Sequence, residues 1–165
     1  MFETMVLISQ TIFLALMAAW LTIGVYDNIR YPKNNENYTS QVLSMELLQS
    51  DFPEVYNRVS HRAIVNRTIQ KLAFLLVIII ESFTSITLWV GFICLIMALN
   101  HAIAFEVAHT IALVGATAFT TIWAGFLVMG NYFCYWYVYE GIQNTHYQMT
   151  LWGIANVIFL VITVM

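Results

Sequence analysis

The sequence predicts an all-α, polytopic membrane protein with four transmembrane helices and a partly helical interfacial loop between the first and second spans. Two observations lead to this fold class. Hydrophobic residues make up 61% of the 165 residues and charged residues only 9%, whereas about a quarter of the residues of a soluble domain are charged. The apolar residues also fall into four long runs. We therefore expect lipid to surround much of the chain.

Four predicted spans follow one another in a single membrane domain, residues 1–165. Residues 4–26 carry no charge, and the N-terminal segment lacks the Lys or Arg and the cleavage site of a removable signal peptide, so this run is expected to stay as a helix. The other spans are 72–99, 107–131 and 147–165; the last is just long enough for a core of roughly 30 Å. Both termini then share one side, the terminal side. The loop 27–71 and the link 132–146 share the other, the loop side.

The long loop 27–71 carries a helical pattern of its own. Asp51 and Glu54 fit a capping box, with Pro53 tolerated in the first turn. Apolar residues then recur at helical spacing on one face: Phe52, Val55, Tyr56, Val59 and Ala63. This pattern predicts an amphipathic helix near the membrane interface. Such a loop either caps the helix bundle or presents a docking surface for a partner, and the sequence leaves both alternatives open.

Small residues form a stripe along the third predicted span. They recur at four-residue spacing: Ala108, Ala112, Ala116, Thr120 and Ala124. Small side chains let membrane helices approach closely. The stripe therefore predicts close helix packing, either inside the bundle or between subunits, and we expect the first.

Glu81 is an ionisable residue inside the second predicted span. It lies about ten residues after Lys71, which places it near mid-membrane by counting, where a charge costs roughly 2.5–3.5 kcal/mol on insertion scales. Counting from the loop side on the other spans predicts an intramembrane polar layer of Glu81, Asn156 and a hydroxyl of Thr120 or Thr121. Such a layer either fixes helix register by interhelical hydrogen bonds or relays protons or binds a cation.

The four histidines are divided between the two sides of the membrane. His61 and His146 are expected on the loop side, and His101 and His109 on the terminal side. A membrane haem needs two axial ligands at similar depth on facing helices. We therefore expect no metal and no cofactor.

The cysteines, the catalytic motifs and the net charge of the sequence give no sign of other chemistry. Cys94 and Cys134 are expected toward opposite faces, too far apart for a disulfide. The chain has no Ser–His–Asp arrangement and no glycine-rich phosphate loop, so no enzymatic activity is expected. A formal net charge of -3 without a basic tract gives no reason to expect nucleic acid as a partner.

Several short segments carry a family resemblance. They are Asp27-Asn28, Gln41-Val42-Leu43-Ser44-Met45-Glu46, His61-Arg62-Ala63-Ile64, Glu81, Gly91, Gly130-Asn131, Trp136 and Gln143-Asn144. With these segments the chain resembles an uncharacterised family of predicted small bacterial integral membrane proteins. Gln41 stands where that family has a histidine, and His61 where it has a tryptophan. The resemblance implies a multi-pass protein of the bacterial inner (cytoplasmic) membrane.

Two observations favour opposite orientations of the chain in the membrane. All six Lys and Arg residues lie in the loop 27–71, and the positive-inside rule would place such a loop in the cytoplasm. The resembled family tends to have a basic second link, which would put that link in the cytoplasm and the first loop outside. Here residues 100–106 contain no Lys or Arg. We expect the first loop to be outside.

The function expected from these observations is partner binding without catalysis. Membrane lipid surrounds the spans, and the ordered loop binds a protein partner, either as an accessory subunit of a membrane complex or as an immunity protein against a membrane-directed toxin. The loop residues expected to contact the partner are Met45, Glu46, Arg58, His61 and Arg62. The alternatives are a small transporter or channel that uses Glu81 and a haem-binding membrane protein.

Overall fold

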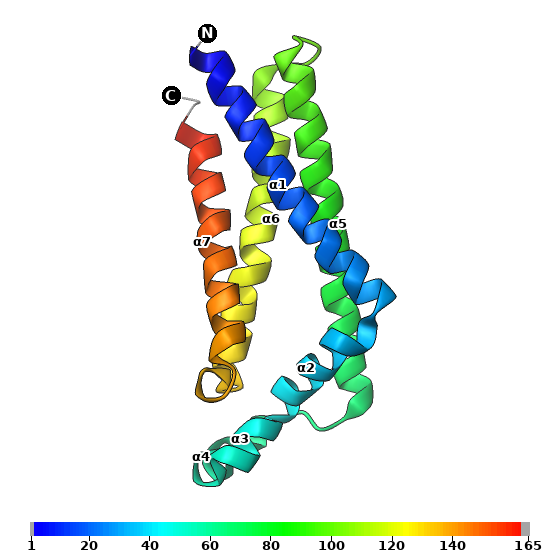
Figure 1. The fold of residues 1–165 in the computed structure, drawn as a ribbon, viewed down its shortest axis with the longest axis vertical. Helices are drawn as coiled ribbons and strands as arrows, with labels where there is room; N and C mark the ends of the chain where they lie inside the picture. The colour runs from blue at the N-terminus through cyan, green and yellow to red at the C-terminus, as the bar shows by residue number, and fades with distance from the viewer. Residues whose placement is uncertain (1, 163–165) are drawn as a thin grey trace.

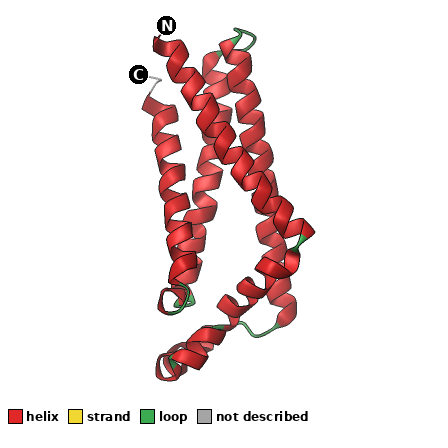
Figure 2. Ribbon diagram, viewed as in Figure 1, coloured by secondary structure: helices red, strands yellow, loops and turns green. Residues whose placement is uncertain are grey.

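The computed structural model describes residues 2–162 of the chain. Seven α-helices and two short 3-10 turns make up these residues: α1 (Phe2–Arg30), α2 (Pro32–Ser44), α3 (Glu46–Asp51), α4 (Pro53–Val59), η1 (Ser60–Arg62), α5 (Arg67–Leu99), α6 (Phe105–Tyr132), η2 (Tyr135–Tyr137) and α7 (Glu140–Ile162). The described part of the chain contains no strand (Figure 2). The all-α fold class is confirmed.

Four of these helices, α1, α5, α6 and α7, are long and apolar enough to cross a membrane. They run up and down in chain order, and the start of α1 and the end of α7 lie at the same end of the bundle (Figure 1). Helices α5 and α7 begin before the predicted spans 72–99 and 147–165, and residues 163–165 lie outside the described residues. The limits of the spans within the bilayer stay predictions.

Helices α5 and α6 pack at backbone distance. A Cβ atom added to Gly91 would lie 2.9 Å from the Cα atom of Ala112, and one added to Gly115 would lie 3.2 Å from the Cα atom of Leu88. Ala112 and Ala116 have no exposed surface. This part of the small-residue stripe therefore lies inside the bundle, where close approach maximises van der Waals contact.

An aromatic cluster joins α1 to α6 and α7. The ring of Trp20 lies 6.2 Å from Phe119, 5.3 Å from Trp123 and 6.4 Å from Trp152, in edge-to-face arrangements. Such geometry is favourable for aromatic pairs. Helix α1 crosses the bundle diagonally, beside α7 near the termini and beside α5 at the loop side (Figure 1).

Residues 32–66, which comprise α2, α3, α4 and η1, form a folded cap at the loop side. A small apolar core, separate from that of the bundle, joins the cap to the link between α6 and α7: it consists of Leu43, Met45 and Leu48 of the cap and Phe133 and Cys134 of the link. Helices α3 and α4 project beyond the end of the bundle (Figure 1). The loop is therefore more helical than the sequence predicted, because α2 was not expected.

The predicted capping box is wrong. Asp51 is the last residue of α3, and its carboxylate accepts a hydrogen bond from Ser50 at 2.6 Å. The N-cap of α4 is Phe52, which makes no side-chain cap hydrogen bond, and Pro53 opens the helix. The amphipathic segment is also shorter than expected, because the chain leaves helical geometry after η1, with Ala63 extended.

Candidate functional site

Glu81 belongs to α5, and its side chain faces α1 and is 5% exposed. Its Oε2 atom accepts a hydrogen bond from Asn28 Nδ2 at 3.0 Å, and Asn28 Oδ1 accepts one from Asn35 Nδ2 at 2.6 Å. Asn35 belongs to α2 and is exposed. A chain of three polar side chains therefore connects the buried carboxyl to the loop-side surface.

A second group of polar side chains lies further along the contact between α1 and α5, which we call the seam. The Thr22 and Ser85 hydroxyls are 2.8 Å apart, and Trp89 Nε1 donates to Thr22 Oγ1 at 2.9 Å. Thr22 also donates to the Ala18 carbonyl. These bonds join α1 and α5 through side chains that would otherwise leave polar groups unpaired in an apolar environment.

The hydrogen-bond partner of Glu81 favours a shallower position in the membrane than counting from Lys71 gave. Its partner Asn28 stands between Asp27 and Arg30, which are exposed at the end of α1. The charge-free part of α1 is 23 residues long, about 35 Å of helix, so a core of roughly 30 Å ends near Asp27. This contact favours a position for Glu81 near the loop-side boundary. Counting from Lys71 gave a deeper position because it did not allow for α5 starting well beyond the end of α1, alongside α2.

The other residues of the expected polar layer do not join Glu81. Asn156 Nδ2 donates to the Trp152 carbonyl at 3.0 Å. The Thr120 and Thr121 hydroxyls donate to carbonyls one turn earlier in α6, at 2.7 and 2.8 Å. Each of these side chains satisfies its hydrogen-bonding group within its own helix.

Helix register explains why the layer does not assemble. Gly91 packs on Ala112, and Gly153 packs on Thr120. By this register Glu81 is level with about residue 122 of α6 and Asn156 with about residue 117, a difference of roughly 7 Å along the axis. Helix α6 also contacts both α5 and α7 and separates the two.

Beyond the two polar groups the seam becomes apolar. Leu14, Leu88 and Leu95 have no exposed surface and fill the space between α1, α5 and α6. The polar chain from Asn35 therefore ends in the loop-side half of the bundle. Chemically, the arrangement can hold a proton or a hydrogen bond at Glu81, but the described side chains do not continue it toward the terminal side.

A third buried polar contact, between Gln10 and His109, was not predicted from the sequence. His109 Nε2 lies 2.8 Å from Gln10 Oε1, and His109 Nδ1 lies 3.1 Å from the Phe105 carbonyl. Gln10 Nε2 donates to the Phe159 carbonyl at 2.9 Å. The group links α1, α6 and α7 near the terminal side. Counting from that side would not have paired them, because Gln10 is six residues into its predicted span and His109 only two residues into its own.

The cap is fastened to the link between α6 and α7. Arg62 Nη1 donates to the Tyr132 carbonyl at 3.2 Å, and the Arg62 guanidinium lies 5.2 Å from the centre of the Tyr132 ring. Within the cap, the Ile64 amide donates to the Leu43 carbonyl at 2.7 Å. Phe52 packs against Tyr137 with ring centroids 5.4 Å apart. These contacts give the loop a defined position.

The five loop residues expected at a partner surface have different environments. Met45 is 1% exposed and has a left-handed backbone with φ of 57°. Arg62 is half-buried against the link, whereas Glu46, Arg58 and His61 are exposed. Met45 and Arg62 therefore hold the cap together, and the three exposed residues remain available to a partner.

Two tyrosines outside the spans are perturbed by their surroundings. Burial raises the pKa of Tyr139 to about 12, and the nearby carboxylates of Glu46 and Asp51 act in the same direction. The Leu47 backbone acts against this shift, but the Tyr139 hydroxyl makes no hydrogen bond of ordinary geometry. Burial also raises the pKa of Tyr135.

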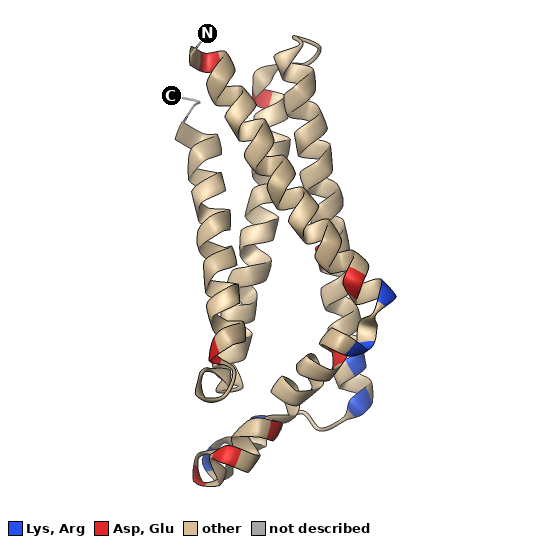
Figure 3. Ribbon diagram, in the orientation of Figure 1, with Lys and Arg blue, Asp and Glu red and all other residues tan. Residues whose placement is uncertain are grey.

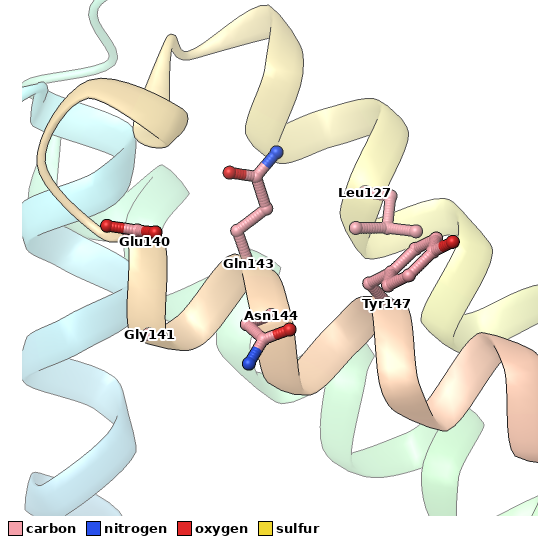
Figure 4. Close-up of a pocket in the computed structure, with 6 residues that line it drawn as sticks. All are labelled: Leu127, Glu140, Gly141, Gln143, Asn144 and Tyr147. Carbon is pink, nitrogen blue, oxygen red and sulfur yellow. The ribbon is translucent and has the colours of Figure 1, made fainter.

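Two shallow depressions lie between α6 and α7. One, of about 500 Å³, lies where α7 begins against α6 and is lined by Leu127, Glu140, Gly141, Gln143, Asn144 and Tyr147. In Figure 4, Leu127 and Tyr147 lie close together, and the Gln143 side chain extends from α7 toward α6. The other is an apolar groove between α6 and α7 that includes Thr120 and Thr121.

The remaining candidate ligands are dispersed. His61 is exposed in η1, and His101 lies in the turn after α5 with φ of 57°. The ring of His146 lies among Trp123, Phe126 and Tyr135. Residues 2–162 contain no group of three or more His, Cys, Asp or Glu side chains that could hold a metal ion. Cys94 and Cys134 are both free.

The fold and the buried polar seam define a class: a small, four-helix integral membrane protein with a folded cap on one side. Residues 6–163 match the family described as predicted small integral membrane protein (domain of unknown function 2165), and the chain belongs to this family. No curated protein matches the chain. No solved structure matches it either.

Proposed function

We propose that the protein is a non-enzymatic membrane protein that binds a protein partner through the outer face of its cap. The observation that carries this proposal is the separate core of the cap. Ordering a residue of backbone costs roughly 1–2 kcal/mol, and the cap core with its contacts to the link at Phe133 and Cys134 offsets this cost for a whole loop. A loop that only connected two spans would not need such a core.

The outer face of the cap suits protein recognition. Its polar residues are exposed: Glu46, Gln49, Asp51, Glu54, Asn57, Arg58 and His61. Figure 3 shows acidic and basic positions together on α3 and α4, away from the bundle. Mixed charges on a rigid surface select partners by complementary potential. Both an accessory subunit of a membrane complex and an immunity protein against a membrane-directed toxin fit this geometry.

The proposed location is the bacterial inner membrane, with the cap outside. Replacing exposed Gln49 by cysteine gives a reporter on the cap, and Asn100→Cys gives one in the turn between α5 and α6. A membrane-impermeant maleimide should label the first in intact cells and the second only after permeabilisation. The reverse labelling pattern would place the cap in the cytoplasm.

Partner binding is tested by purification from native membranes in mild detergent. The wild-type protein should retain a stoichiometric partner, and the double variant Glu54→Arg, Arg58→Glu should lose it, because two charges of the outer face, one acidic and one basic, are reversed. The matched control is Glu3→Gln, which changes a charge on the opposite side of the bundle. If no stoichiometric partner is found, or if the double variant keeps it, the proposal is rejected.

The seam around Glu81 supports a structural role beside this function. Its hydrogen-bond chain joins α1, α2 and α5, the elements that lead into the cap. We therefore propose that Glu81 positions the start of the cap relative to the bundle. The transporter alternative would require a polar route past Leu14 and Leu88, which are fully buried.

A further inference from the structure

Four of the six Lys and Arg residues gather at one corner of the loop side. The basic corner consists of Arg30 at the end of α1, Lys33 at the start of α2, and Arg67 and Lys71 at the start of α5. All four are exposed. Helix α2 contacts both α1 and α5, and Figure 3 shows the blue positions of these three elements on the same side of the molecule.

Helix geometry confirms that the cations of α5 face the end of α1. Ser85 contacts Thr22 of α1 and so marks the α1-facing side of α5. Arg67 precedes Ser85 by 18 residues, which is five full turns, and Lys71 follows Arg67 by about one turn. Because α1 ends before it reaches them, both residues lie beyond the end of α1 along α5. Arg67 Nη1 also donates a hydrogen bond to Gln70 Oε1 of the same helix at 3.0 Å.

Exposed apolar side chains occupy the adjoining face of α5 at the same height. Leu72, Leu75, Leu76 and Ile79 are 59%, 50%, 56% and 43% exposed. Soluble surfaces seldom expose such a contiguous apolar stripe. An occupant of this surface must therefore be apolar along α5 and anionic at the corner.

We propose that the basic corner binds the phosphate headgroup of an anionic phospholipid whose acyl chains lie along the exposed apolar face of α5. Arginine forks pair well with phosphate oxygens, and lysine supplies a flexible point charge. Arg30 also lies over Tyr31, 5.3 Å from the ring centre, and tyrosine favours the headgroup layer. Asp27 and Glu36 lie in the same segments, so four cations against two acids leave the corner with a charge of +2.

This site is separate from the outer face of the cap and does not depend on the partner proposed above. It also assigns a role to the loop charges other than orientation. Basic residues next to a span are attracted to anionic leaflets, and each contributes a few-fold in affinity. The attraction falls with ionic strength because exposed charges are screened by salt.

The experiment compares lipid retention by delipidated protein in detergent. The protein is titrated with phosphatidylglycerol or with phosphatidylcholine of the same chains, and bound lipid is counted by native mass spectrometry. We expect the wild-type protein to prefer phosphatidylglycerol by roughly tenfold or more. The variant Arg30→Gln, Lys33→Gln, Arg67→Gln, Lys71→Gln should lose this preference, and Arg58→Gln, an exposed cation on α4, should keep it.

Further arms separate the possible sources of the signal. Glycerol phosphate, the headgroup chemistry without acyl chains, should not displace the lipid at equal concentration, because the apolar face contributes to binding. Equal retention of both lipids, full displacement by glycerol phosphate, or the same loss in Arg58→Gln would overturn the proposal. If the fourfold variant does not fold, Lys33→Gln and Lys71→Gln, each measured alone, should reduce the preference several-fold, and an unchanged preference in both would also reject the site.

Discussion

The bundle and the cap are stabilised in different ways. In the bundle, α5 and α6 approach at backbone distance through Gly91 and Gly115, and the core is closed by leucine, alanine and aromatic side chains. In the cap, a small core around Met45 and Leu48 is fastened to the link by Arg62. The packing of α5 on α6 depends on glycines that have no side chain, whereas the cap depends on a few particular side chains. The two regions should therefore respond to different substitutions and should be separable by experiment.

The largest effect is expected in the bundle from Gly91→Leu. The added side chain would meet the Ala112 backbone, which cannot move away without displacing α6. Overpacking costs roughly 1–3 kcal/mol in ordinary cores, and we expect more than about 3 kcal/mol here because the obstacle is main chain. Thermal unfolding of the variant and the wild-type protein in detergent measures this loss of stability.

Gly125→Leu is the matched control for this prediction. Gly125 also lies within a long helix, α6, but a Cβ atom placed there meets nothing within 4 Å. Its substitution should change the unfolding temperature little. If Gly91→Leu and Gly125→Leu are equally stable, close packing of α5 on α6 does not hold the bundle together.

The next largest effect is expected in the cap from Met45→Ala. Met45 is 1% exposed, and its removal leaves a cavity in the small core. Such truncations cost about 2–5 kcal/mol, and we expect about 2 because the cap can partly collapse. Limited proteolysis should cut residues 32–66 faster while α5 and α6 stay intact. The exposed neighbour Glu46→Ala is the control. Unfolding of the whole protein by Met45→Ala would show that the two regions are not separable.

A smaller effect should appear at alkaline pH through Tyr139. Its folded pKa of about 12 lies above the ordinary value of 10, so folding favours the protonated hydroxyl. Its contribution to cap stability is fully present below about pH 10 and is lost as the pH rises through about 12. Two pKa units correspond to at most about 2.8 kcal/mol, and we expect a loss of roughly 1–2 kcal/mol because solvent screens part of the interaction. Proteolysis of the cap across this range measures the loss.

Tyr139→Phe tests the assignment of this alkaline effect. The Tyr139 hydroxyl makes no hydrogen bond of ordinary geometry, although the Leu47 backbone interacts with it, so its removal should change stability at neutral pH little. The variant should also flatten the pH dependence, leaving the part due to Tyr135, whose pKa is raised by burial as well. An undiminished alkaline loss in Tyr139→Phe would assign the titration to another group.

The sequence predicted the fold class because membrane helices have a strong local signal. Long apolar runs and their separation by polar segments suffice for four helices, and the four-residue spacing of Ala108, Ala112 and Ala116 indicated a packing stripe, which lies inside the bundle as expected. The apolar period of the loop indicated the helix that follows Asp51, but not α2. These features depend on residues that are close in sequence.

The candidate site could not be predicted to the same extent. The partner of Glu81 depends on where α1 ends relative to α5, and this offset is set by packing between helices that are distant in sequence. Counting from the nearest charge, Lys71, assumed that all helices begin at one level. The burial of Met45 and Arg62 likewise arises from contacts with residues 132–139 that local spacing does not reveal.

The smallest effect is expected from Glu81→Gln, at the border between the two regions. The glutamine carbonyl oxygen can accept the Asn28 hydrogen bond in place of Oε2, so stability should change by less than about 1 kcal/mol. Glu81→Leu removes the acceptor and leaves the Asn28 amide unpaired, which costs roughly 1–3 kcal/mol. Unfolding in detergent compares both with Glu106→Gln, an exposed control on α6. If the glutamine variant unfolds more easily than the leucine variant, the hydrogen bond is not what Glu81 contributes. If it folds normally but abolishes ion or proton flux in proteoliposomes that the wild-type protein supports, Glu81 acts in transport.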